Sequence, residues 1–220
     1  QLKKKYTFQA DPFLIEKDDK LYVFYEAFSF RNSKGTLRCR ILDRELTEID
    51  DVKLEGFDDL RCHLSFPFLI NINNQLFMIP ESSERKEVLL FQSVEFPARW
   101  KKIKVLLSDT EVTDNIFLSI NETCYLLSTT MDNKIIIHSA EHLHGQWQRI
   151  TPTLKVSNHH HRGAGTPYLV DNKMYFLTQE CTPETYGKSI YIKELVTLND
   201  INFDENLIEQ INSSINHSDG

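Results

Sequence analysis

HLSFPFLININNQLFMIPES, residues 63–82, consists of two apolar runs separated by the polar triplet Asn73-Asn74-Gln75. A polar turn between two apolar runs is typical of a β-hairpin, so the pattern predicts two strands joined by a tight turn. The second strand ends at Glu81, directly after a run that should be buried. The stretch therefore predicts a β-rich fold and a carboxylate at the end of a buried strand.

The same pattern occurs three more times along the chain. The four copies are ADPFLIEKDDKLYVFYEA (10–27), SFPFLININNQLFMIPES (65–82), TDNIFLSINETCYLLSTT (113–130) and GTPYLVDNKMYFLTQE (165–180). Their anchor residues, Pro12, Pro67, Asn115 and Pro167, are 55, 48 and 52 residues apart. This spacing is close to the roughly 40–50 residues of a four-stranded propeller blade. The sequence thus predicts an all-β fold, a five-bladed β-propeller with four clear blades and a fifth that is incomplete or built from both chain ends.

The segments between the hairpins supply further strands, so one propeller domain is expected over residues 1–220. The expected units are blades at about 9–54, 60–107, 112–152 and 162–204, with closing strands at 3–8 and 205–220. Residues 207–215, LIEQINSSI, fit either a short helix or a strand, and a strand is favoured. Propellers remove their open edges by closing into a ring. The few residues left at the two chain ends do not decide whether a complete fifth blade closes this ring.

The amino-acid composition argues against some classes of binding partner. The chain of 220 residues carries 25 Lys and Arg against 32 Asp and Glu, a formal charge of −7, which argues against binding to nucleic acid or to an anionic membrane surface. No apolar run of about 18 residues and no basic leader is present, so no membrane span is expected. Four scattered cysteines without a CxxC pair suggest reduced thiols and a cytoplasmic location. The first residue is Gln, which suggests that the chain was excised from a longer one.

Propeller geometry explains the carboxylate at residue 81. In each hairpin the start of the first strand and the end of the second lie at the same end, facing one mouth of the central channel. By this alignment the strand starts bring Asp11, Phe66, Asp114 and Thr166 to the mouth, and the strand ends bring Glu26, Glu81, Thr129 and Gln179. Four of these eight side chains are carboxylates. A ligand site at this mouth is therefore expected.

Each acidic residue has a structural interpretation beside the functional one. Asp11 and Asp114 precede a strand, where aspartate often only accepts backbone N–H bonds, so structure and chemistry both stay open. For Glu26, a solvated strand end is the favoured interpretation. Glu81 follows LFMIP, and apolar walls raise the pKa of a carboxyl group toward that of a general acid, so function is favoured.

Further polar residues flank the same mouth. His63 is either a core histidine or a partner for a sugar hydroxyl, and Gln179 lies at a strand end. Arg162 precedes the small residues 163–165 and could bind an acid or hold the carboxylates in place. Tyr186 is either a stacking wall or a core aromatic residue. No metal and no cofactor are expected, because the consecutive residues 159–161, all histidine, point in different directions.

Several of these motifs carry a resemblance to a known family. ADPFL, HLSFPFLI through LFMIPESS, VEFPARW, TDNIF, and RGAGTPYL through YFLTQE with YGKSI together resemble the N-terminal propeller domain of plant glucosamine inositolphosphorylceramide transferases. The same domain occurs in bacterial proteins of surface-sugar synthesis, some of them fused to formyltransferase-like domains. More distantly, the chain is similar to five-bladed glycosidases, a group that includes arabinanases, β-xylosidases and invertases.

The distant resemblance implies roles for individual residues. In those glycosidases the Asp of an Ala-Asp-Pro strand start is the general base, an Asp in the third blade positions it, and a Glu in the fourth blade is the acid. Asp11 and Asp114 match the first two, whereas Gly165-Thr166-Pro167 stands where the Glu would be needed. Inverting hydrolysis requires an acid and a base roughly 6.5–9.5 Å apart. Without the fourth-blade acid, Glu81 would have to protonate the leaving group.

Two functions from different classes therefore remain. One is an accessory module that holds a saccharide at the channel mouth for a fused or associated transferase domain, and the missing acid favours it. The other is a glycosidase-like enzyme with Asp11 as base, Glu81 as acid, and Asp114 and Arg162 tuning them.

Overall fold

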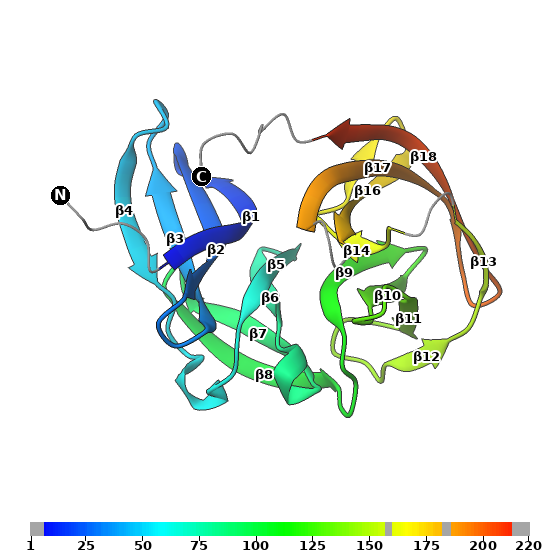
Figure 1. Ribbon diagram of the computed structural model, residues 1–220, viewed down its shortest axis with the longest axis horizontal. Coiled ribbons are helices and arrows are strands. Elements are labelled where there is room, and N and C mark those ends of the chain that lie inside the picture. The colour runs from blue at the N-terminus through cyan, green and yellow to red at the C-terminus, as the bar shows by residue number, and fades with distance from the viewer. Residues whose placement is uncertain (1–6, 157–159, 182–185, 213–220) are drawn as a thin grey trace.

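The structure is a computed structural model that describes residues 7–156, 160–181 and 186–212, with the side chain of Tyr186 excepted. In this part of the chain, four β-sheets stand around a common axis, as the blades of a propeller do (Figure 1). The predicted all-β class and propeller arrangement are confirmed. Among the described residues, no helix is long and apolar enough to span a membrane.

The first three sheets each contain four strands in antiparallel order. The first sheet has β1 (Thr7–Lys17), β2 (Lys20–Ser29), β3 (Lys34–Leu42) and β4 (Glu48–Lys53). The second has β5 (Ser65–Ile72), β6 (Gln75–Glu81), β7 (Val88–Glu95) and β8 (Arg99–Leu107). The third has β9 (Thr113–Ile120), β10 (Thr123–Thr129), β11 (Ile135–Ala140) and β12 (Gln148–Ile150). Two short 3₁₀ helices, Asp58–Leu60 and Ser83–Arg85, lie in connections.

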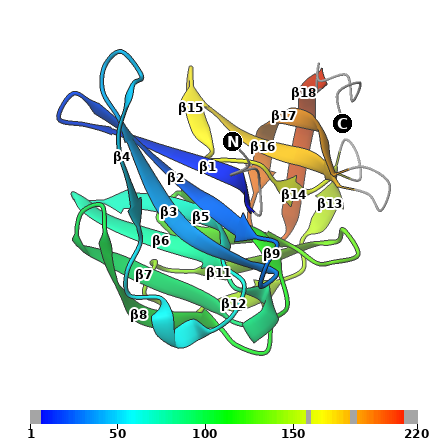
Figure 2. The ribbon, with the colours of Figure 1, turned by 60° about the vertical axis from the view of Figure 1, so that its left-hand side comes forward.

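The fourth sheet departs from this plan. Its strands are β13 (Thr153–Lys155), β14 (Arg162–Gly163), β15 (Tyr168–Val170), β16 (Lys173–Cys181), β17 (Tyr186–Leu198) and β18 (Asn202–Asn212). The inner position is shared by β14 and β15, which both pair with β16, and β15 lies in an arm that projects from the ring (Figure 2). Residues 205–212, expected among the closing strands, instead continue β18 along β17. Residues 207–212 form a strand, as favoured for residues 207–215, and residues 213–215 lie outside the described part of the structure.

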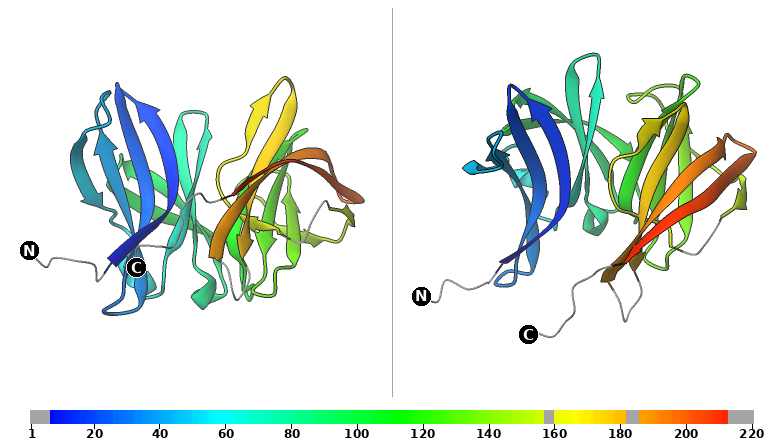
Figure 3. Two further views of the ribbon diagram at one scale, coloured as in Figure 1. Left: turned by 45° about the horizontal axis from the view of Figure 1, so that its top comes forward. Right: turned by 90° about the horizontal axis from the view of Figure 1, so that it is seen from above.

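The four predicted hairpin turns are present. Asn73 and Asn74 have φ angles of 51° and 62°, and the equivalent pairs in the other sheets also have positive φ at both positions. Two consecutive positive φ angles define the turn type whose twist matches that of antiparallel strands. These turns lie at the same end of the molecule, so the strand starts and ends lie together at the opposite end (Figure 3).

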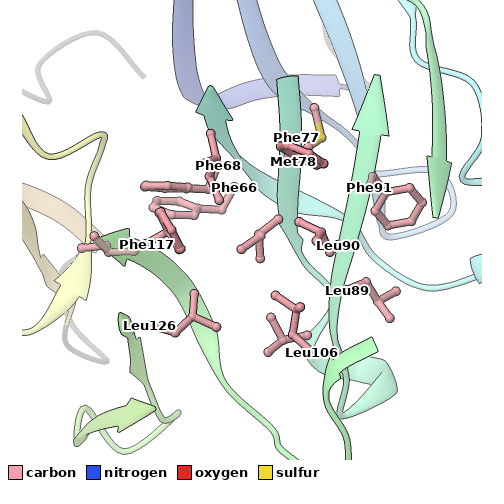
Figure 4. Packing of buried hydrophobic residues seen from close by; sticks show 14 of the residues in the cluster. Phe66, Phe68, Phe77, Met78, Leu89, Leu90, Phe91, Leu106, Phe117 and Leu126 are labelled. Carbon is pink, nitrogen blue, oxygen red and sulfur yellow. The ribbon is translucent and has the colours of Figure 1, made fainter. Parts of the chain in front are cut away.

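The core lies between neighbouring sheets. The inner strands contact one another in chain order, β1 with β5, β5 with β9, and β9 with β14. Figure 4 shows Phe66, Phe117 and Leu126 in the space between the second and third sheets. Residues of the second sheet such as Met78 and Phe91 are fully buried. This packing of sheet faces fixes the inner strands around the axis and so positions the mouth.

Candidate functional site

Three inner strands carry the same backbone irregularity at the mouth. Asp11, Phe66 and Asp114 have φ angles of 52°, 43° and 48°, and each lies where the pairing with the second strand shifts. Positive φ is rare for residues other than glycine, and such β-bulges redirect a side chain or end the regular pairing. The repeat seen in the sequence is therefore a repeat of bulges at equivalent positions.

Carboxylates of the preceding sheet bind these bulges. Asp11 Oδ2 accepts a hydrogen bond of 3.2 Å from the backbone N–H of Phe66. Glu81 Oε2 likewise accepts one of 3.2 Å from the N–H of Asp114, and Ser83 Oγ donates to Glu81 Oε1 at 3.1 Å. These contacts tie the first sheet to the second and the second to the third. Asp11 therefore accepts a backbone N–H bond, which is one of the two roles that the sequence left open for it.

Glu81 and Asp114 form a buried acidic pair beside Arg162. Glu81 is 5% exposed and Asp114 2%, and burial raises the pKa of both carboxyl groups. After burial, the charge of Glu81 is the next largest cause of the raised pKa of Asp114, so a proton on one member of the pair is favoured. The Arg162 guanidinium donates from Nε to Asp114 Oδ2, which stabilises the remaining negative charge. Arg162 thus contacts one of the carboxylates expected at this mouth.

Glu26 is buried, contrary to the solvated strand end favoured from the sequence. It is 4% exposed, and its Oε1 lies 3.4 Å from His63 Nε2. Burial, followed by the charges of Asp11, Glu81 and Asp114, raises the pKa of Glu26 to about 8. Burial lowers the pKa of His63. Both shifts favour the uncharged forms of the two groups.

Gly35 makes this arrangement possible and was missed by the sequence interpretation. Its N–H donates to His63 Nδ1 at 3.0 Å, so the proton of the neutral imidazole resides on Nε2, the nitrogen nearer Glu26. A Cβ at residue 35 would lie 2.4 Å from Glu26 Oε1 and 2.5 Å from the carbonyl oxygen of Leu64. Nothing in the sequence around Gly35 indicates that it faces two distant residues.

Asp11 lies at the edge of the cluster and is partly exposed. Burial, followed by the neighbouring Asp114, raises the pKa of Asp11 to about 6, against the opposing effects of the Phe66 N–H and Arg162. Asp11 thus ionises near neutral pH. Its environment differs from that of Glu26, which keeps its proton to higher pH.

The fourth sheet corrects the alignment of the last sequence copy. Gln179 pairs with Arg162, as Glu26 pairs with Ala10 in the first sheet, whereas the alignment had paired Gln179 with Thr166. Gln179 Nε2 also donates to the carbonyl oxygen of Gly163 at 2.9 Å. Thr166 is exposed, outside the strand pairing. Three small residues at 163–165 leave no apolar alternation from which the register could have been recognised.

Gly163 occupies the position equivalent to Asp11 and Asp114. A Cβ at residue 163 would lie 2.7 Å from the carbonyl oxygen of Asp114 and 3.1 Å from Phe66 Cζ. The inner strands approach so closely here that no side chain fits. On this backbone the fourth blade therefore has no room at residue 163 for the acid that the glycosidase resemblance requires.

The remaining predictions lie at the margin of the described residues. Tyr186 begins β17 opposite Cys181, and its side chain lies outside the described part of the structure. His159 is also outside it. Within the described ranges, no group of three or more His, Cys, Asp or Glu side chains could hold a metal ion.

The site residues separate by exposure into two layers. Glu26, Glu81 and Asp114 are buried, whereas the side chains of His63 and Arg162 are 24% and 18% exposed. Asp11 and Gln179 are partly exposed as well. Four of the site residues are thus accessible to solvent at the mouth, whereas the three carboxyl groups of Glu26, Glu81 and Asp114 are largely shielded from it.

A cavity of about 920 Å³ lies apart from this cluster, between the third sheet and the turn that joins β17 to β18. Its lining includes Tyr125, His142, His144 and Asp200. None of the predicted site residues lines it.

The sequence of the chain is similar to that of one known protein family. A family model described as glucosamine inositolphosphorylceramide transferase 1, N-terminal, matches residues 2–218. Two curated relatives bear the name glucosamine inositolphosphorylceramide transferase 1. The Arabidopsis thaliana protein is 30% identical over 203 residues, which are 87% of this chain and 26% of the relative. The Oryza sativa subsp. japonica protein is 27% identical over 206 residues, 87% of this chain and 27% of the relative. The chain thus spans about a quarter of the length of these relatives.

Solved structures similar to this one are glycoside hydrolases. An exo-β-1,3-galactanase from Phanerochaete chrysosporium with galactose has a TM-score of 0.71 at 10% identity, covering 95% of this chain and 53% of the other. A GH43 β-1,3-galactosidase has a TM-score of 0.68 at 8% identity, with 96% and 78% covered, and a β-xylosidase 0.67 at 13%, with 89% and 73% covered. At such low identity the similarity shows a shared fold, which agrees with the distant resemblance seen in the sequence.

Proposed function

The chain belongs to the family defined by the N-terminal domain of glucosamine inositolphosphorylceramide transferase 1, and we propose that its propeller holds a saccharide at the mouth of the central channel. Its relatives and its structural neighbours make it a glycan-related propeller domain. The observation that supports the finer proposal is the convergence of Asp11, Glu26, Glu81 and Asp114 with Arg162 at one rim.

The chemistry of the exposed layer suits a sugar. Saccharide sites place a few convergent polar groups against hydroxyls, and carboxylates, guanidinium and imidazole groups bind hydroxyls as acceptors or donors. Asp11 offers an acceptor, Arg162 offers a donor, and His63 offers a donor through Nε2–H, because its Nδ1 already accepts the Gly35 N–H. The buried carboxyl groups behind them hold these side chains in fixed orientations.

Titration with glucosamine and with galactose, followed by NMR chemical shifts, tests this proposal. The largest shifts are expected at Asp11, His63 and Arg162. The Asp11→Asn variant should bind about tenfold more weakly or worse, because a hydrogen bond to a charged group contributes about 1.5–3 kcal/mol. Asp58→Asn, whose side chain is 77% exposed in the 3₁₀ helix Asp58–Leu60, is the matched control. Shifts confined to the outer strands, or unchanged binding by Asp11→Asn, would contradict the proposal.

A second candidate function is hydrolysis of a glycosidic bond. It is favoured by the split between Asp11, with a pKa of about 6, and Glu26, with a pKa of about 8, because such pairs can serve as base and acid. Glu81, the acid expected from the sequence, has both carboxylate oxygens in hydrogen bonds to Ser83 and to the backbone of Asp114. Glu26, in the first sheet, is therefore a better candidate for the proton donor than Glu81, in the second sheet.

Release of galactose from β-1,3-galactotriose distinguishes the two functions. An enzyme would lose turnover in the Asp11→Asn, Glu26→Gln or Glu81→Gln variant while still binding the trisaccharide. Binding without any release by the parent chain supports the module. Because the chain covers a quarter of its curated relatives, we propose that such a module serves a transferase domain in the same or an associated polypeptide.

A further inference from the structure

Three phenylalanines gather where the first sheet extends beyond the rim. Phe8 lies on β1, Phe28 on β2, and Phe30 in the turn after β2. Their ring centroids are 4.9 Å apart for Phe8 and Phe28, 5.6 Å for Phe8 and Phe30, and 5.4 Å for Phe28 and Phe30. Phe8 is 43% and Phe30 57% exposed. Three contacting aromatic rings, two of them open to solvent, form a patch of the kind that marks a binding surface.

The aromatic patch, Phe8, Phe28 and Phe30, lies on the sheet face that carries the site. Side chains alternate along a strand, so Phe28 shares a face of β2 with Glu26 and with the core residue Phe24. Phe8 is the cross-strand neighbour of Phe28. The patch therefore belongs to the same face as the acidic cluster, and not to the opposite face of the first sheet.

His63 joins the patch to the polar cluster. Its ring centroid is 5.8 Å from that of Phe28, and its Nε2 is 3.4 Å from Glu26 Oε1. His63 thus contacts an aromatic ring on one side and a hydrogen-bonding group on the other. His63 is itself fixed by Gly35 and by Glu84, whose carboxylate accepts its backbone N–H at 2.9 Å.

This juxtaposition matches the two-sided chemistry of a sugar ring. A pyranose presents C–H groups on its face and hydroxyls at its edge, and binding sites pair an aromatic surface with a few placed polar groups. A hydrocarbon chain would use the rings but would leave the neighbouring polar groups without a partner. A saccharide uses both, so it is the occupant that the arrangement favours.

We propose that Phe8, Phe28 and Phe30 form a stacking subsite for the second sugar of a glycan whose first sugar lies at the rim. The subsite rests on the proposed saccharide function, and it extends that function from a single sugar to an oligosaccharide. The site would then run from Arg162 and Asp11 past His63 to the aromatic patch.

Comparison of monosaccharides with their trimers tests the subsite. The probes are galactose with β-1,3-galactotriose, and glucosamine with its β-1,4-linked trimer, measured by calorimetry. A trimer of the preferred sugar should bind more tightly than its monomer, and Phe30→Ala should weaken trimer binding about three- to tenfold while leaving monomer binding unchanged. Phe8→Ala should act in the same direction. Phe30→Trp should preserve trimer binding because it keeps an aromatic face.

Leu14→Ala is the matched control, because Leu14 is a large apolar residue on β1 with 61% exposure and no part in the patch. Phe30 lies in an exposed turn, so its replacement should leave the fold intact, which circular dichroism can verify. Trimers that bind no better than monomers, or a trimer gain that persists in Phe30→Ala, would overturn the subsite while the rim site stands. Absence of binding for all four probes would overturn both proposals.

Discussion

At the scale of single residues, the site depends on carboxyl groups whose burial only the folded chain creates. The sequence predicted that Asp11, Glu81 and Asp114 share one end of the molecule, because strand starts and ends follow from the repeat. It did not predict the burial of Glu26, which comes from Gly35 and His63, two residues brought in from other segments. Local patterns carry no information about such contacts, so Glu26 looked like an ordinary strand end.

Burial of Glu26 should make stability depend on pH. The pKa is raised from the ordinary value of 4.5 to about 8, so between these values the folded chain holds a proton that the unfolded chain has lost. The free energy of unfolding should therefore fall as pH rises from 5 to 9, by roughly 3–5 kcal/mol from this group. Glu26→Gln should reduce that slope and be more stable than the parent at pH 9.

Denaturant unfolding at several pH values measures this slope. Glu48→Gln, which replaces an exposed carboxylate of the same sheet, is the matched control variant. A profile of Glu26→Gln parallel to that of the parent would show that Glu26 ionises normally in the folded protein.

Arg162 should matter for stability as well as for ligand contact. Its guanidinium pairs with Asp114, and removing one partner of a buried ion pair costs about 3–5 kcal/mol. Arg162→Met should thus be destabilised at pH 8, and less at pH 5, where the carboxyl groups are protonated. Adding Asp114→Asn should recover part of the loss. Arg44→Met, at an exposed ion pair with Asp19, should cost less than about 1 kcal/mol in the same thermal unfolding measurements.

At the scale of secondary-structure elements, hairpins were predictable and the fourth inner strand was not. Paired residues such as Asn73-Asn74 and Asp171-Asn172 indicate turns directly, and their positive φ angles confirm the prediction. The segment of residues 162–168 has no apolar alternation, and the fourth copy was aligned three residues too far along the chain. The inner edge of that sheet is two short strands, β14 and β15, because its backbone passes against Asp114.

Gly163 should not tolerate a side chain. Its missing Cβ leaves room for the carbonyl oxygen of Asp114, so Gly163→Ala should destabilise the fold by about 1–3 kcal/mol through overpacking. The exposed Thr166, three residues later, provides the control variant Thr166→Ala. Equal melting temperatures for the two variants would mean that the third and fourth sheets can separate locally without cost.

At the scale of the whole molecule, the four sheets pack in chain order around the axis, with the first and fourth at the two ends of the series (Figure 1). The second and third sheets have a neighbour on both faces. The period of the repeats made this arrangement predictable. The first and fourth sheets carry exposed apolar side chains, such as Leu14 on β1 and Ile208 on β18.

Amide hydrogen exchange should follow this order. Protection should be greatest in β6 and β7, where Met78, Ile79 and Leu89 are fully buried, because local opening there requires disruption of two interfaces. The lowest protection among the strands is expected in β15, whose residues Tyr168–Val170 are all exposed. Mass spectrometry of peptic peptides measures the gradient. Uniform protection across the four sheets would contradict it.

The close approach at Gly163 also limits how this scaffold could acquire new chemistry. Replacing that glycine with glutamate, one codon change away in principle, would push a carboxylate into the main chain of the adjoining sheet. A hydrolase built on this backbone would therefore have to take its acid from another sheet.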